Sequence, residues 1–72
     1  MQKLKKIEIK VNGKVKSIPL KYSILDLVKN LNISIKKVAI ELNQEIIDKK
    51  NINKINLKNN DKIEIVHFIG GG

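Results

Sequence analysis

Hydrophobic and polar residues alternate at the start of the chain. Apolar residues occupy every second position over 7–11, and Asn12-Gly13 follows, a dipeptide that accepts a positive φ at both centres of a tight hairpin turn. The pattern predicts a strand over 7–11 and a returning strand over 14–20. Because Pro19 has no N–H to donate to a ladder, we expect the second strand at a sheet edge.

The next segment has helical spacing. Its apolar residues recur on one helical face: Ile24, Leu25, Leu27, Val28 and Leu31. Ser23, followed three residues later by Asp26, resembles a capping box, in which each side chain accepts a hydrogen bond from the other residue's backbone. We therefore predict an amphipathic helix over 24–31.

The second half of the chain contains two strong strand patterns separated by weaker segments. We predict, in order, a loop over 32–37 that keeps Ile33 or Ile35 packed, a strand over 38–42, a turn at Asn43-Gln44, a short strand over 45–48, an irregular crossing or a single helical turn over 49–57, a turn over 59–61 and a strand over 62–69. In the last strand, Ile63 and Ile65 face one side and Val66 and Phe68 the other.

This order of elements predicts an α+β fold, with one main helix packed across one face of a mixed sheet of four to five strands. It is the pattern of a β-grasp domain, which we expect over 1–69, with a flexible glycine tail over 70–72. The first and last strands are the most regular and apolar, so we expect them to pair in parallel at the centre of the sheet.

Composition limits the chemistry that the chain can perform. It has 72 residues, no cysteine and one histidine. A chain this short buries about 60% of its unfolded surface and cannot enclose a deep active site. Without cysteine it has no thiolate nucleophile or cysteine metal site, and one histidine cannot form a cluster. We predict that the chain is not an enzyme, has no catalytic residue of its own, and binds no metal or cofactor. We expect His67 to have a structural role, either half-buried or hydrogen-bonded to backbone.

The charge of the chain points weakly to an acidic partner. Fifteen Lys against seven acidic residues give a net charge of +8. None of the basic residues is Arg, the residue that forks onto phosphates and guanine edges, and Tyr22 and Phe68 are too far apart in sequence for a base-stacking platform. Ile, Lys and Asn make up 38 of the 72 residues, which AT-biased codons explain without binding. We therefore expect no nucleic-acid partner, although a basic nucleic-acid-binding module stays an alternative that a steep salt dependence would support.

The lysine pairs and the N-terminal segment have simple interpretations. Lys5-Lys6, Lys36-Lys37 and Lys49-Lys50 are expected to be solvated, and one pair can steer association with an acidic groove of a partner.

The positive charge at the start of the chain is followed by alternation and not by the apolar run of a signal peptide. No window approaches the roughly 18 apolar residues of a membrane span. We expect a cytoplasmic protein with no membrane partner.

The last predicted strand runs into Gly70-Gly71-Gly72, and we expect the terminal carboxylate to be exposed. Three extended glycines reach about 10 Å, have no side chains to block a narrow slot, and tolerate almost any φ. A carboxylate presented in this way can be activated in a partner's active site, for example as an acyl-adenylate. On composition alone, a frayed end or an expression scar explains the glycines equally well.

Three segments give the chain a resemblance to the ThiS family, the sulfur carriers of thiamine biosynthesis. They are Asn12-Gly13, the Val-Ala-Ile-Glu-Leu-Asn run over 38–43, and the segment over 61–72. Gly-Gly endings also occur in ubiquitin-like modifiers and in the small subunit of molybdopterin synthase, but the Glu-Ile-Val-His-Phe run before three glycines is much more specific. The resemblance covers nearly the whole chain, departs from the family in the N-terminal lead and over 49–60, and implies a ubiquitin-like β-grasp fold.

The resemblance implies a function for the tail. The carboxylate of Gly72 is adenylated by a ubiquitin-activating-like adenylyltransferase that uses ATP and magnesium, and is then converted to a thiocarboxylate. The sulfur comes from a cysteine-derived persulfide, and the thiocarboxylate is delivered to thiazole synthase. Gly70 and Gly71 thread the partner's channel. The chain is then a protein substrate and sulfur carrier.

Alternation places Val66 and Phe68 on the sheet face away from the helix, and we predict that this apolar pair beside the tail is a docking patch for the activating enzyme unless a loop covers it. Two other functions stay open. A carrier like the small subunit of molybdopterin synthase shares the fold and tail but serves a different acceptor enzyme. A small structural or inhibitory subunit with an incidental tail would undergo no ATP-dependent modification.

Overall fold

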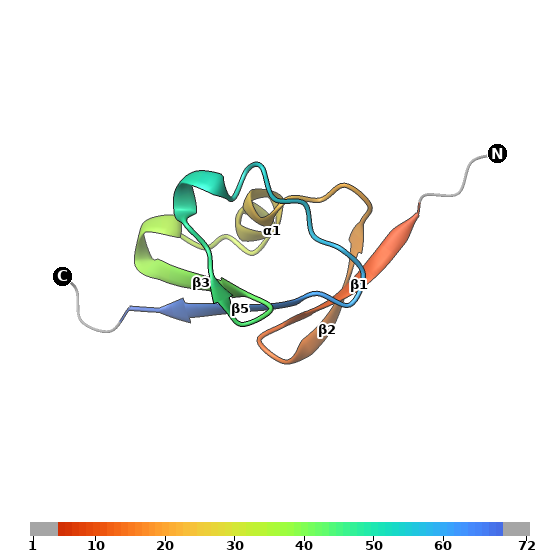
Figure 1. Ribbon diagram of the computed structural model, residues 1–72, viewed down its shortest axis with the longest axis horizontal. Helices are drawn as coiled ribbons and strands as arrows, with labels where there is room; N and C mark the ends of the chain where they lie inside the picture. Colours follow the sequence, from red (N-terminus) through yellow and green to blue (C-terminus); the bar gives the residue numbers. More distant parts are fainter. Residues whose placement is uncertain (1–4, 69–72) are drawn as a thin grey trace.

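The computed structural model describes residues 5–68, and in this part of the chain five strands form one mixed sheet with helix α1 across one face (Figure 1). The elements in chain order are β1 (Lys6–Val11), β2 (Lys14–Pro19), α1 (Ile24–Asn30), the 3₁₀ turn η1 (Ile35–Lys37), β3 (Val38–Leu42), β4 (Glu45–Ile46), the 3₁₀ turn η2 (Lys49–Asn51) and β5 (Lys62–His67). The predicted α+β fold class is confirmed.

The sheet has the strand order β2-β1-β5-β3-β4, which places β5 at its centre. β1 pairs with β5 in parallel, β2 pairs with β1 antiparallel, and β3 pairs with β5 antiparallel. The parallel pairing of the first and last strands and the edge position of the strand that contains Pro19 were both predicted correctly. The prediction for the fourth strand was too long, because β4 ends at Ile46 and the Ile47 side chain packs against the core.

Two hairpin turns place residues at positive φ. Asn12 (φ 50°) and Gly13 (φ 83°) join β1 to β2, and Asn43 (φ 50°) and Gln44 (φ 73°) join β3 to β4. Two consecutive residues with positive φ match the right-handed twist of the strands that they connect. Both turns were predicted from the sequence.

The predicted capping box starts α1. Asp26 N–H donates to Ser23 Oγ at 3.0 Å, and Ser23 N–H donates to Asp26 Oδ2 at 3.0 Å. These bonds satisfy backbone donors that the first helical turn leaves without partners. The helix ends at Asn30, one residue before the predicted end, because Leu31 is its C-cap.

The core lies between α1 and one face of the sheet. Its buried residues are Ile9, Ile18, Ile24, Leu27, Val28, Val38, Ile40, Ile52, Leu57, Ile63 and Ile65. The segment over 49–57 crosses beside the helix start after the single turn η2, as predicted, and Leu57 N–H donates to the Tyr22 carbonyl at 2.8 Å. Ile33 and Ile35 both pack against the core. Within residues 5–68, no helix is long and apolar enough to cross a membrane.

Candidate functional site

β5 is the strand that leads toward the glycine tail, and its two faces differ in exposure. Ile63 and Ile65 point into the core, whereas Val66 is 54% and Phe68 57% exposed. The two exposed residues lie on the sheet face opposite α1, which we call the open face. Their alternation and exposure agree with the sequence analysis. Ile69 and Gly70 to Gly72 lie outside the described residues, so the roles predicted for Gly70, Gly71 and Gly72 stay predictions.

The apolar surface around Val66 extends to neighbouring strands. Ala39 on β3 is its cross-strand partner, and Ile46 on β4, 78% exposed, lies on the same face two strands away from β5. Sequence reasoning missed Ile46, because only the register of β4 against β3 shows which face it occupies. The open face therefore has an apolar area that is broader than the predicted pair.

Phe68 is held by contacts with both 3₁₀ turns. Its N–H donates to the carbonyl oxygen of Lys37 at 2.9 Å, so the pairing along β3 continues one residue beyond β5. The ammonium nitrogen of Lys49 on η2 lies 5.0 Å from the centroid of the Phe68 ring, within the range of a cation–π interaction. The lysine contacts the ring, but more than half of the residue stays exposed.

Two asparagine side chains fix the backbone of β5 from opposite sides. Asn12 Oδ1 accepts a hydrogen bond from Ile65 N–H at 2.7 Å, and its Nδ2 donates to the Ile65 carbonyl at 3.2 Å. On the other side, Asn43 Oδ1 accepts from Lys62 N–H at 2.9 Å. β1 ends at Val11, so the Asn12 carboxamide takes the place of a strand residue that β1 does not supply. The sequence identified both residues only as turn formers.

His67 differs from its prediction. We expected it to be half-buried or hydrogen-bonded to backbone because it shares the alternation of Ile63 and Ile65, but it is exposed. It is the last residue of β5, where the strand extends past α1 (Figure 1), so the helix does not cover it. His67 therefore contributes to the surface next to the tail and not to the core.

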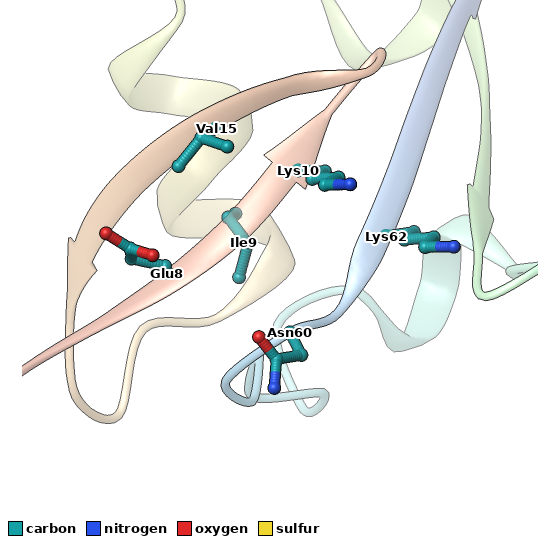
Figure 2. Close-up of a pocket in the computed structure, with 6 residues that line it drawn as sticks. All are labelled: Glu8, Ile9, Lys10, Val15, Asn60 and Lys62. Atoms are coloured by element: carbon teal, nitrogen blue, oxygen red, sulfur yellow. The ribbon is translucent and has the colours of Figure 1, made fainter.

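A shallow pocket on the sheet has a volume of about 210 Å³ (Figure 2). It is lined by Glu8, Ile9, Lys10, Val15, Asn60 and Lys62. Ligand clefts usually enclose about 300–1,000 Å³ and combine apolar walls with converging polar groups. This lining combines one carboxylate, two ammonium groups and an amide, a set with no nucleophile paired to a base.

Known proteins resemble the chain in sequence and in structure. The model of the ThiS family matches residues 8–72. Over 50 residues the chain is 44% identical to the sulfur carrier protein ThiS of Bacillus subtilis (strain 168), covering 69% of this chain and 76% of that protein. The crystal structure of the thiamine biosynthesis protein ThiS from Geobacter metallireducens matches with a TM-score of 0.80 and 26% identity, covering 92% of this chain and 100% of that one.

A longer protein also contains a similar segment. The chain is 33% identical over 66 residues to a thiazole synthase of Paramagnetospirillum magneticum, which covers 92% of this chain but 20% of that protein. The chain therefore spans about a fifth of the length of that relative.

Proposed function

The chain belongs to the ThiS family and has its β-grasp fold, and on this basis we propose that it is a sulfur carrier of thiamine biosynthesis. The observation that carries the proposal is that the family match runs from residue 8 through Gly72, and thus includes the sheet and the glycine tail together. The group that carries sulfur in this proposal is the carboxylate of Gly72.

The chemistry requires activation by a partner, because a carboxylate is a poor electrophile. A Gly72 carboxylate oxygen attacks the α-phosphorus of ATP, with magnesium on the phosphates, and pyrophosphate leaves. The terminal sulfur of a cysteine-derived persulfide then attacks the acyl carbon and displaces AMP. A thiol then attacks the donor's sulfur in the resulting S–S bond, which leaves the thiocarboxylate on Gly72 and a disulfide between the thiol and the donor cysteine. The chain acts as a protein substrate in this scheme, and the catalytic groups belong to the adenylyltransferase and the sulfur donor.

Thiazole synthase is the proposed acceptor of the sulfur. The similarity between this chain and a segment of a thiazole synthase supports that assignment, because a carrier joined to its acceptor in one protein is held at a high effective concentration. A separate carrier must instead bind the acceptor and then leave it.

We assign Val66 and Phe68 as the docking patch for the activating enzyme. Their exposure next to the tail supports this role, since most of a folded domain's larger apolar side chains are covered. Gly70 and Gly71 pass through the enzyme's channel, where any side chain would meet the channel wall.

The intact mass of the protein tests the proposal. The chain is incubated with ATP, magnesium, a sulfide source and the adenylyltransferase from its own organism. The expected result is a mass gain that equals the exchange of one oxygen for one sulfur, and a chain that lacks Gly72 serves as the control. If this enzyme modifies another carrier but leaves the present chain unchanged, the proposal is wrong. Modification only by the enzyme that activates the small subunit of molybdopterin synthase would assign the carrier to that acceptor instead.

A further inference from the structure

The two 3₁₀ turns of the described chain carry lysine pairs, and both lie at the end of the molecule where β5 ends (Figure 1, green and teal). η1 contributes Lys36 and Lys37, and η2 contributes Lys49 and Lys50. We call these four residues the lysine collar. The Lys37 carbonyl accepts the Phe68 N–H at 2.9 Å, and the Lys49 ammonium lies 5.0 Å from the centroid of the Phe68 ring. Phe68 is two residues before the glycine tail in sequence, so Lys37 and Lys49 contact the last residue that the structure describes.

Charge is distributed unevenly over the surface of the described residues. The open face is balanced, since its strands present three lysines and three glutamates on that side: Lys6, Lys10, Lys62, Glu8, Glu41 and Glu64. The excess positive charge of the chain therefore lies elsewhere. In the collar segments, four lysines accompany one carboxylate, Asp48, which accepts the Lys50 N–H at 2.9 Å. The stretch over 27–40, which leads into η1 and β3, contains no acidic residue.

We infer that the lysine collar is a second contact surface for the activating enzyme. The collar lysines pair with carboxylates of the enzyme at the rim of the channel that receives the glycine tail. This inference rests on the proposed function. The tail reaches its channel only if the carrier approaches in one orientation, and positive charge gathered on the two turns near Phe68 selects that orientation before contact. Lysine suits this role because its hydrated point charge attracts an acidic surface over about 8 Å at physiological salt without requiring close, desolvated pairing.

The collar and the docking patch form one continuous surface at Phe68. The Phe68 ring lies under the Lys49 ammonium, and the residue stays more than half exposed, as Val66 does. An enzyme that covers the ring therefore meets the Lys49 ammonium at the same time. Apolar contact with Val66 and Phe68 slows dissociation of the complex, whereas the lysines raise the association rate and orient the carrier as it approaches.

Charge reversal of two lysine pairs tests the inference, because Lys5-Lys6 provides a matched control at the opposite end of the molecule (Figure 1). The variants are Lys36→Glu with Lys37→Glu, and Lys5→Glu with Lys6→Glu. Each changes the formal net charge from +8 to +4. All four side chains are exposed, and the carbonyl that binds Phe68 is retained in the first variant. Pyrophosphate release is measured against carrier concentration at low salt, and melting temperatures are compared.

We expect the collar variant to raise the KM for the carrier by about tenfold with little change in kcat, and the control variant to raise it less than about twofold. Added salt should bring the two variants together, because it screens the contact that only one of them has lost. Lys36→Gln with Lys37→Gln should give a smaller rise of the same kind. If the collar variant melts early, the glutamine variant decides the result.

Two results would overturn the inference while leaving the proposed function intact. Equal KM changes in the collar and control variants would show a diffuse attraction set by net charge alone. An unchanged KM together with lost binding to a single-stranded RNA would make the collar a nucleic-acid surface. By contrast, failure of the enzyme to adenylate the unsubstituted chain would refute the proposed function itself.

Discussion

Asn12 offers the sharpest test of how the fold holds the strand that carries the tail. Replacing Asn12 with glycine removes the carboxamide and keeps a residue that accepts the φ of 50° at this position. The variant loses the hydrogen bonds from Ile65 N–H at 2.7 Å and to the Ile65 carbonyl at 3.2 Å. At about 0.5–1.5 kcal/mol for each bond, we expect the free energy of unfolding to fall by about 2 kcal/mol.

For a domain of this size, that loss lowers the melting temperature by roughly 10 °C, which thermal unfolding followed by circular dichroism measures directly. Hydrogen exchange gives a local reading, because the Ile65 amide should exchange faster in the variant. The matched control is Asn32→Gly, which also removes an asparagine side chain at positive φ (57°), in the turn that follows α1. It should change the stability by less than about 0.5 kcal/mol. Equal losses in the two variants, or an Asn12 variant as stable as the unsubstituted chain, would refute the reasoning.

Three further substitutions test separately the docking role of Phe68, the passage of Gly71 through the enzyme's channel, and the contribution of the Ser23 helix cap to stability. Phe68→Asp should raise the KM for the carrier in the adenylation assay while the melting temperature changes little, whereas Phe68→Leu should keep most of the affinity; a large drop in melting temperature for the Asp variant would assign Phe68 to packing. Gly71→Trp should abolish adenylation and leave the circular dichroism spectrum unchanged, and normal adenylation would exclude a narrow channel. Ser23→Ala should cost about 1 kcal/mol of stability through loss of the helix cap, with adenylation kinetics unaltered; an altered KM would mean that the helix start contacts the enzyme.

Local patterns predicted most of the fold because they depend on neighbouring residues. The turn at Asn12-Gly13, the capping box of Ser23 and Asp26, and the alternation of β5 each act over a few positions and were all correct. The family was also predicted correctly, from three short segments of which the one before the glycines is the most specific. In each of these patterns and segments, the residues that determine the prediction are close to one another in sequence.

The pairings that hold the site could not be predicted, because they join distant parts of the chain. Asn12 and Ile65 are 53 positions apart, and nothing around Asn12 distinguishes a turn former from a residue that also completes a sheet ladder. The contact of Lys49 with Phe68 depends on where the 49–57 crossing lies, which its irregular pattern leaves open. His67 was placed wrongly for a related reason, since alternation gives the face of a strand but not how far the helix covers it.

The arrangement around β5 explains how so small a domain can serve as a carrier. A chain of this length forms one core, and that core holds β5 at the centre of the sheet between β1 and β3. The backbone of β5 is also hydrogen-bonded by two asparagine carboxamides, one from each neighbouring hairpin turn. Binding of a partner to the exposed side of this strand would therefore fix the position of Phe68 relative to the partner's surface. Only the four residues that follow remain to be guided, and three of them are glycines without side chains. In the proposed scheme, the firmly held end of β5 lets a partner bind next to the tail and apply its own catalytic groups to the Gly72 carboxylate, four residues beyond Phe68 in sequence.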